Sequence, residues 1–225
     1  DKYLLGDKHT ITIRNGVELD DVNDARDIKA IRNEFDLNDE TKIIATVANF
    51  RKVKNHLFLL RGFKELTEKV NNVKLLLIGQ GTAGDQENTE HDVRNYVEVN
   101  GLHDKVILSG HRSDVSDVLS IADVFCLTSH SEGLPISMLE AMSAGLPVVG
   151  TNVPGIRDVI RHRRNGFLVN LGDQAGLNDA LLQLLSNEKL RLRFGQESRR
   201  IVEEIYSMDQ CVASYRDLFL RLADN

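Results

Sequence analysis

The chain has 225 residues, with 28 basic and 34 acidic side chains, so its formal net charge is -6 at pH 7. This balance argues against non-specific nucleic-acid binding, which needs a basic face against the phosphates, but it leaves room for a small basic pocket that holds one anion. Hydrophobic residues make up 41% of the chain, as in ordinary globular proteins, and no apolar run reaches the roughly 18 residues of a membrane-spanning helix.

The first forty residues show the weakest pattern. Residues 10–14 alternate between polar and apolar side chains, which predicts a strand. Asn15 and Gly16 then favour a turn, and residues 24–35 have helical spacing.

Beyond residue 40, short apolar runs alternate with segments of helical period. The predicted strands are 43–47, 73–78, 106–108, 124–127, 148–149 and 166–169. Most are apolar on both faces, as strands are when helices cover both sides of a sheet. The predicted helices between them are 54–70, 87–100, 114–122 and 136–144. This alternation predicts right-handed crossovers and one Rossmann-like, doubly wound parallel sheet of the α/β class.

After Val169 the pattern is helical alone, over 174–186, 188–204 and 208–222. Ser207 and Gln210 have the spacing of a capping box that opens the last helix. No internal repeat, low-complexity stretch or long linker interrupts the chain, so we expect residues 1–225 to form a single domain with a helical tail.

Glycine and proline gather in one segment that follows a predicted strand. All three prolines (Pro135, Pro147 and Pro154) fall within twenty residues, beside four glycines. A loop that contains Gly133 therefore joins the strand that ends near Leu127 to the helix that begins near Ile136. In an open parallel sheet, ligands bind beyond the carboxyl ends of the strands. Free N–H groups at the start of the helix would favour an anion there, most naturally a phosphate.

Two glutamates bracket this turn. Glu140 would lie on the order of 6 Å into the helix, where its carboxylate suits a vicinal diol such as a ribose. Glu132, on the loop, would then reach a second polyol across the phosphates. The alternatives are structural: Ser137 and Glu140 themselves have capping-box spacing, and Glu132 would be a solvated loop acid.

The segment 79–84 fits the G-x-G-x-x-G pattern and follows a strand, which invites a dinucleotide-binding interpretation. Three features argue against it. The next residues are acidic and polar where an apolar helix should pack, the following strand ends in Ser109 and Gly110 without an acid for the ribose, and the motif follows the second core strand. We expect these glycines to open a turn near the phosphates of the bound ligand instead.

Other polar residues carry weaker indications. The histidines form no metal-type cluster with cysteine, so we predict no metal site. His56 and His111 lie beside the proposed binding loops, and the alternative is that they are ordinary polar residues. No Gly-x-Ser-x-Gly elbow surrounds Ser129 or Ser131. The basic run 161–164 is interpreted as a solvated loop, with contact to an acidic membrane or partner as the alternative.

The stretch from Glu132, Gly133, Leu134 and Pro135 through Glu140 to Val149 resembles the paired-glutamate motif of family 4 (group 1) glycosyltransferases. These are retaining sugar-nucleotide enzymes with the GT-B fold. Other stretches agree in order over residues 10–222: 15–17 near the start, Lys54 after the first core strand, Gly79 and Gly81 after the second, Gly110 and His111 after the third, and 165–169 late in the chain. The similarity corresponds to the C-terminal, donor-binding half of such an enzyme.

The resemblance implies a role for each matching residue. Glu140 should hold the ribose, Glu132 should contact the transferred sugar, and Lys54 should neutralise the diphosphate leaving group; Lys54 would otherwise be a solvated lysine. Backbone groups at Gly133 and Leu134 should meet the sugar or the diphosphate. The loop Gly110, His111 and Arg112 should border the base. The family usually has an arginine where this chain has Asn49, and Arg51 is the candidate to replace it.

The resemblance also implies the wider context. We expect a nucleotide-diphospho-sugar donor, UDP in the first instance, as substrate and no separate cofactor or metal. The first residue is not methionine, so we expect a piece of a longer chain whose N-terminal half carries the acceptor. The last helix would cross back to that half or, alternatively, pack on its own domain. Peripheral membrane contact would come through the full-length protein.

Three functional hypotheses are distinguished at this stage. The first is the donor half of a hexosyltransferase that is inactive without its other half. The second is a non-catalytic regulatory module of the same fold, for which Asn49 leaves room. The third is a nicotinamide-dependent dehydrogenase, against which the residues around 79–84 argue. Cys126 and Cys211 form no paired motif, so we expect a reducing, cytoplasmic setting.

Overall fold

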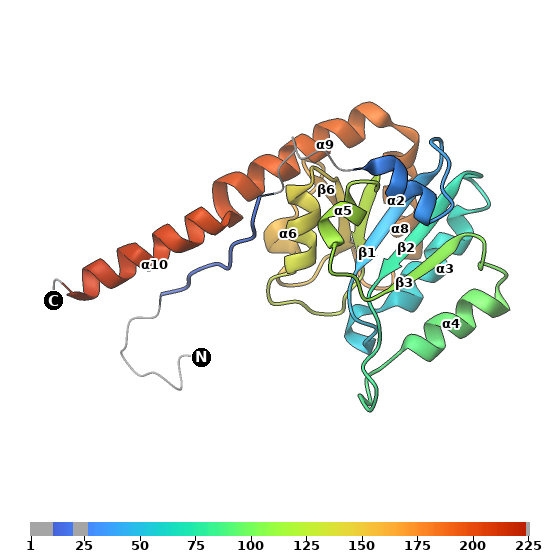
Figure 1. The fold of residues 1–225 in the computed structure, drawn as a ribbon, viewed down its shortest axis with the longest axis horizontal. Coiled ribbons are helices and arrows are strands. Elements are labelled where there is room, and N and C mark those ends of the chain that lie inside the picture. Colours follow the sequence, from blue (N-terminus) through green and yellow to red (C-terminus); the bar gives the residue numbers. More distant parts are fainter. Residues whose placement is uncertain (1–10, 20–26, 224–225) are drawn as a thin grey trace.

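The computed structural model describes residues 11–19 and 27–223. In this part of the chain, six parallel strands form one sheet in the order β3-β2-β1-β4-β5-β6 (Figure 1). The strands are β1 (Lys42–Val47), β2 (Val73–Ile78), β3 (Val106–Gly110), β4 (Val124–Leu127), β5 (Val148–Thr151) and β6 (Gly166–Val169). The predicted Rossmann-like, doubly wound α/β sheet is confirmed.

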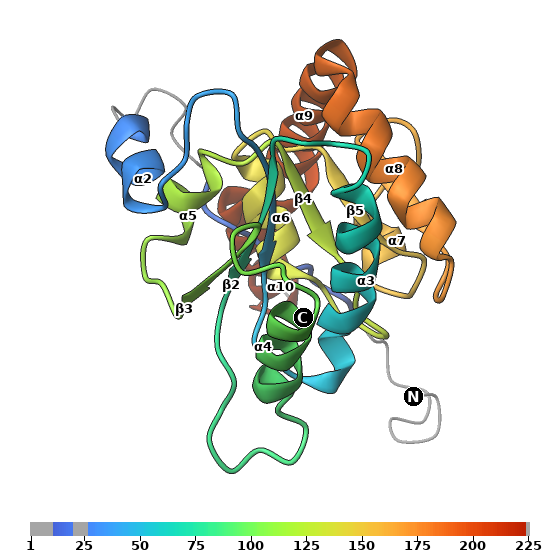
Figure 2. The same cartoon turned by 90° about the vertical axis from the view of Figure 1, so that its right-hand side faces the viewer.

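Helices cover both faces of the sheet (Figure 2). One face carries α3 (His56–Leu66), α4 (Glu90–Val99) and α8 (Gln174–Ser186), and the other carries α2 (Ile28–Glu34), α5 (Val115–Leu119) and α6 (Ile136–Ser143). Neighbours along one strand therefore enter different cores: Leu75 and Leu77 pack with α3 and α8, whereas Leu76 packs with α5. This double coverage explains why the strands are apolar on both faces.

The strand order reverses between β1 and β4. From β1 the chain moves outward through β2 to β3, and from β4 it moves outward through β5 to β6 on the other side. The helices that follow β1 and β4, α3 and α6, consequently lie on opposite faces of the sheet. This switch point is where an open α/β sheet leaves a crevice for ligands.

The structure differs from the sequence predictions mainly at the edges of elements. The strand predicted over 10–14 is wrong for residues 11–14, which have no regular structure; residue 10 lies outside the described residues. The helix predicted over 24–35 corresponds to α2 (Ile28–Glu34), and residues 24–26 lie outside the described residues. A short helix, α7 (Ile156–Val159), was not predicted, and α9 (Glu188–Ile201) passes into a π-helical turn (Val202–Tyr206).

The last helix, α10 (Met208–Ala223), leaves the body of the domain (Figure 1). It starts as predicted, since the Ser207 hydroxyl accepts a hydrogen bond from the Gln210 N–H at 3.4 Å. None of its described residues is buried, and Val212, Tyr215 and Phe219 are among the exposed apolar side chains. The alternative in which this helix packs on its own domain is therefore wrong. No helix in the described ranges is long and apolar enough to cross a membrane.

Candidate functional site

The loops that follow β1 and β4 enclose a cavity of about 600 Å³, which we call the switch-point cavity. The sequence-predicted residues that line it are Asn49, Arg51, Lys54, Glu132, Gly133, Leu134 and Pro135. Val47, Ala48, Val53, Ser131, Ile136 and Ser137 complete the lining. Two segments about 80 residues apart in sequence thus meet at the point where the strand order reverses.

A lysine and a glutamate form the polar centre of this cavity. Lys54 Nζ lies 2.7 Å from Oε1 of Glu132, and the side chains keep 22% and 10% of their exposure. The hydroxyl of the buried Ser129 donates to the same oxygen at 2.5 Å. Both contacts fall on Oε1, so within the described part of the chain Oε2 is left for a further donor. Glu132 is therefore a held carboxylate and not the solvated loop acid of the alternative.

The backbone fixes the position of Lys54. This residue ends a 3₁₀ turn (Lys52–Lys54), and Asn55 then adopts a left-handed conformation with φ 54° before α3 begins. The N–H of His130 donates to the carbonyl of Val53 at 2.7 Å, which ties the turn to the loop after β4. The lysine is thus held against Glu132 by its own loop.

Behind Lys54 lies the buried His56. Its ring meets Phe50 edge-on at 4.8 Å, and neither ring nitrogen has a partner in the described residues. Burial, and next the positive charge of Lys54, lower the pKa of His56 to about 4. The ring is therefore neutral at physiological pH and packs as a small aromatic group, so the cation at this end of the cavity is Lys54.

Helix α6 opens toward the same cavity. It begins at Ile136 after Pro135, and no side chain caps its N-terminus. Ser137 lies inside the first turn, so the alternative in which Ser137 and Glu140 form a capping box is wrong. The N–H groups at a helix start lack partners within the helix, and together they favour an anion at this end.

Glu140 faces a second cavity, of about 550 Å³, which is also lined by Gly16, Val17, Ser116 and Met208. Ile136 lines both cavities, so they adjoin at the first residue of α6. The Glu140 side chain is exposed on the cavity wall, but the surrounding protein removes part of its water, and this desolvation raises the pKa of its carboxyl group.

Gly79, Gly81 and Gly110, in the loops after β2 and β3, line neither of these cavities. The N–H of Gly79 donates to the carbonyl of Gly110 at 2.8 Å, and the N–H of Gly81 donates to the Glu90 carboxylate at 2.8 Å. The glycine run opens no helix, because α4 begins only at Glu90. This geometry is unlike a dinucleotide-binding turn, where the glycine loop leads directly into a helix.

The two residues that follow Gly110 behave differently from each other. His111 is exposed. Arg112 donates to both oxygens of Asp114, at 2.8 and 2.6 Å, pairs with Glu34, and lies over the ring of Phe35. These hydrogen bonds raise the pKa of Arg112 and lower that of Asp114. The guanidinium is thus engaged within the domain.

Asn49 and Arg51, from the same loop as Lys54, both line the switch-point cavity. Arg51 Nε lies 2.8 Å from Oδ2 of Asp85, in the loop after β2. The candidate replacement for the family arginine therefore reaches the cavity but already has an acidic partner.

Sequence reasoning missed part of the support around Glu132. The missing Gly-x-Ser-x-Gly elbow excludes Ser129 as a nucleophile, but it does not reveal that this buried serine holds the Glu132 carboxylate. The hydroxyl of Thr151 in turn donates to the carbonyl of Ser129 at 2.5 Å. A serine three residues before the motif glutamate is the one available indication. Nothing in the sequence pointed to Thr151, which comes from the neighbouring strand.

Comparison with known proteins agrees with this geometry. Residues 27–201 match the family model described as glycosyl transferases group 1. The chain is 31% identical over 194 residues to the N-acetyl-alpha-D-glucosaminyl L-malate synthase of Bacillus anthracis. The aligned residues cover 86% of this chain and 49% of that protein. The chain spans about half the length of the curated relatives it matches.

Solved structures give the same result. A variant of S. aureus TarM in complex with Fondaparinux, alpha-GlcNAc-glycerol and UDP superposes with a TM-score of 0.79 at 25% identity, over 93% of this chain and 39% of that one. HepE of Anabaena in complex with UDP-glucose superposes with a TM-score of 0.84 at 18% identity, over 94% of this chain and 57% of that one, which shows the shared fold. The chain belongs to the group 1 glycosyltransferases.

Proposed function

We propose that this chain is the half of a retaining glycosyltransferase that binds the nucleotide-diphospho-sugar donor, and that the whole protein transfers a hexosyl residue to an acceptor in glycan or glycoconjugate biosynthesis. One observation carries the proposal. The Lys54–Glu132 pair and the uncapped start of α6 face one cavity at the switch point of the sheet. A cation, free N–H groups and a carboxylate are the groups that a sugar diphosphate requires.

The positive groups act on the leaving group. Breaking the bond between sugar and diphosphate places negative charge on the phosphate oxygens, and preorganised positive groups stabilise that charge. Lys54 and the first N–H groups of α6 supply this stabilisation in our proposal without a metal ion. The bound diphosphate would take over Lys54 from Glu132 and free the carboxylate to contact the sugar.

The two adjoining cavities match the two ends of such a donor. A ligand with its diphosphate at the tip of α6 would extend past Ile136 toward Glu140. The carboxylate of Glu140 accepts hydrogen bonds at both oxygens and so suits the ribose hydroxyls. Glu132 lies on the other side of the α6 tip, within reach of the transferred sugar. We propose UDP as the nucleotide, since TarM and HepE were crystallised with it.

The other half of the enzyme is also part of the proposal. The chain spans about half of its relatives, and the apolar side chains of α10 find no cover in the described domain. An N-terminal acceptor domain of the same protein would cover them and supply any peripheral membrane contact. Both cysteines are free, which fits a reducing, cytoplasmic setting.

A non-catalytic module of the same fold is the alternative. It is favoured by one contact: Arg51 is paired with Asp85, so the second phosphate contact is not open in this structure. Such a module would still bind the nucleotide sugar, but sugar transfer by the complete protein would not depend on Glu132.

Calorimetric titration with UDP, GDP, ADP and NAD tests the binding proposal. We expect heat with UDP, weak because the cleft has one wall, and negligible sugar transfer by this chain alone. Heat with NAD alone would overturn the proposal. In the complete protein, Glu132→Gln should abolish transfer while UDP still binds; unchanged transfer would favour the regulatory module.

A further inference from the structure

A second charged cavity lies away from the proposed donor site. It has a volume of about 440 Å³ and is lined by Arg163, Arg164, Arg193, Gln196, Glu197 and Arg200. We call it the arginine cavity. Its residues come from the loop between α7 and β6 and from the outer face of α9. None of them belongs to the motifs that suggested glycosyl transfer.

The two cavities lie at opposite edges of the sheet. The arginine cavity borders the loop that enters β6, at the amino end of that strand, whereas the switch-point cavity lies beyond the carboxyl ends of β1 and β4. The strands are parallel, and four residues of β6 span roughly 13 Å at the usual rise. One ligand molecule in the donor site therefore does not account for the arginine cavity.

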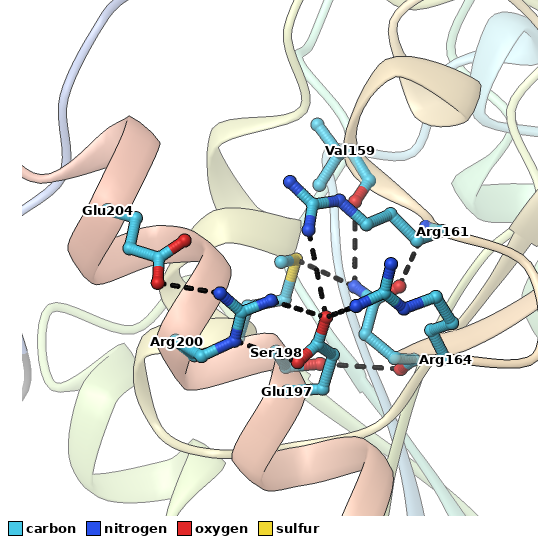
Figure 3. Close-up of polar contacts among 9 residues, drawn as sticks. Val159, Arg161, Arg164, Glu197, Ser198, Arg200 and Glu204 are labelled. Atoms are coloured by element: carbon cyan, nitrogen blue, oxygen red, sulfur yellow. Dashed lines mark hydrogen bonds and ion pairs between the residues drawn. The ribbon is translucent and has the colours of Figure 1, made fainter.

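Positive charge in the arginine cavity exceeds negative charge. Glu197 is the one acid in the lining, and its Oε1 is shared by Arg164 at 3.0 Å and Arg200 at 2.8 Å, with Arg161 at 3.7 Å (Figure 3). The hydrogen bond from Arg200, followed by the nearby positive charges, lowers the pKa of Glu197. Its single negative charge is thus already divided among three guanidinium groups.

Two arginines of the lining have no acidic partner in the described ranges. Arg163 and Arg193 are exposed and form no ion pair there, although the Arg193 guanidinium lies over the ring of Phe194. With four arginines and one glutamate, the lining carries a formal charge of +3. This excess stands out in a chain whose net charge is -6.

Hydrogen bonds through a buried residue connect the two segments that line the arginine cavity. The buried Asn165 accepts a hydrogen bond at Oδ1 from the N–H of Arg161 at 2.7 Å, and its carbonyl accepts from the Ser198 hydroxyl at 3.3 Å. These bonds tie the arginine loop to α9. Arg200 also pairs with Glu204, one turn further along the helix. The guanidinium groups are therefore presented by a fixed frame.

We propose that the arginine cavity binds a phosphate group. Arginine forms paired hydrogen bonds to phosphate oxygens, and its planar fork loses less freedom per bond than a lysine does. A doubly charged phosphate would offset the excess positive charge of the lining and give Arg163 and Arg193 the partner they lack. The phosphate belongs either to a small soluble compound or to the headgroup of an anionic lipid.

Titration with inorganic phosphate at constant ionic strength tests the site, followed by NMR through the amide signals of residues 161–165 and 193–200. We expect these signals to shift with a saturable affinity. The double variant Arg163→Gln/Arg193→Gln should weaken that affinity by about tenfold or more, as the loss of one charged hydrogen bond would do. Glu197→Gln should strengthen it, because it removes the negative charge from the cavity.

Two control variants separate this site from general charge and from the donor cavity. Lys29→Gln/Lys69→Gln removes the same charge at exposed positions elsewhere, and Lys54→Ala removes the cation of the switch-point cavity. Both should leave the affinity at residues 161–165 unchanged. Absence of shifts there, or equal affinity in the arginine double variant, would overturn the proposal whatever happens to UDP binding.

Sedimentation with lipid vesicles identifies the source of the phosphate. Binding to phosphatidylglycerol-containing vesicles, but not to phosphatidylcholine vesicles, that the arginine double variant loses would assign the site to a lipid headgroup. Phosphate-dependent shifts without sedimentation would assign it to a soluble compound. Sedimentation that the double variant retains, without amide shifts at the cavity, would contradict a phosphate site.

Discussion

The carboxyl edge of this sheet has two sides that treat polar groups differently. After β2 and β3, the polar groups find partners within the domain: the N–H of Gly81 on Glu90, and Arg112 on Asp114 and Glu34. After β1 and β4, by contrast, the start of α6 is uncapped and Lys54 and Glu132 line an open cavity. The same edge is thus closed by its own side chains on one side and left for a ligand on the other.

The pKa values of two glutamates are shifted in opposite directions on the two sides. The N–H of Gly81 and the side chain of Arg94 lower the pKa of Glu90, so its carboxylate is satisfied by the protein. Desolvation raises the pKa of Glu140, for which the described residues supply no hydrogen-bond donor. A carboxylate that the folded protein leaves unsatisfied is the one available to a ligand.

The largest expected effect is a loss of folding stability on the closed side of the sheet, after β2. Gly79 has φ 139°, and a Cβ there would lie 2.1 Å from the carbonyl oxygen of Ala48. Gly79→Ala should lower the free energy of unfolding by about 2–5 kcal/mol, from backbone strain and overpacking together. Chemical denaturation measures this loss.

Gly133→Ala is the matched control on the open side. A Cβ at Gly133 would have no atom within 4 Å, because the position faces open space. We expect the unfolding free energy to stay within about 0.5 kcal/mol of the original, with the change appearing in UDP affinity instead. Equal losses of stability in both variants would remove the distinction between the two sides.

The second effect concerns binding at the open side. Lys54→Ala should weaken UDP-sugar binding by roughly 1.5–3 kcal/mol, the range for hydrogen bonds between charged groups. Lys52→Ala is the control from the same turn: Lys52 is 64% exposed and pairs with Glu87 at 3.6 Å. Calorimetry should show little change for Lys52→Ala, and equal losses for both lysines would point to general charge attraction.

The sequence allowed the parallel sheet to be predicted, because local apolar runs alternate with helices, but the strand order and its switch point came from the structure. The boundaries of β2 and α8 were predicted to the residue. The predicted strand is wrong over residues 11–14 because alternation alone does not supply a neighbouring strand. The N–H of Val17 instead donates to the carbonyl of Tyr206 at 2.8 Å, at the end of the π-helical turn.

Within the candidate site, residues next to the turns could be predicted, and their partners could not. Lys54 and Glu132 were assigned to one site by the family resemblance, and the ion pair between them became visible only in the structure. The pairings of Arg51 with Asp85 and of Arg112 with Glu34 depend on side-chain reach across loops, which no spacing encodes. The arginine cavity was visible only as a basic run, since Arg193 and Arg200 come from a helix outside the run.

The third effect uses pH to compare the two glutamates. Glu90 has a lowered pKa in the folded state, so it stabilises the fold above the unfolded pKa near 4.5, and this contribution is lost as pH falls through the lowered value. Glu90→Gln should therefore cost about 1 kcal/mol at pH 7, and the cost should disappear in acid.

Glu140 should behave in the opposite sense. Its raised pKa favours the folded state below pH 4.5, and that contribution is lost as pH rises through the raised value. Glu140→Gln should therefore show no loss of stability at pH 7 while weakening UDP binding. Denaturation curves at several pH values measure both variants. If Glu140→Gln also lost stability at pH 7 and regained it in acid, as expected for Glu90→Gln, the opposite pKa shifts would be contradicted.

The smallest expected effect extends the comparison to apolar groups. Phe219 on α10 is 65% exposed, whereas Phe58 on α3 is 4% exposed within the core. Because its ring already lies in solvent, Phe219→Ala should change the unfolding free energy by less than about 0.5 kcal/mol in this chain. If α10 packs against an N-terminal half, the same Phe219→Ala change should destabilise the complete protein measurably. An equally small effect in both chains would mean that no partner surface covers this helix.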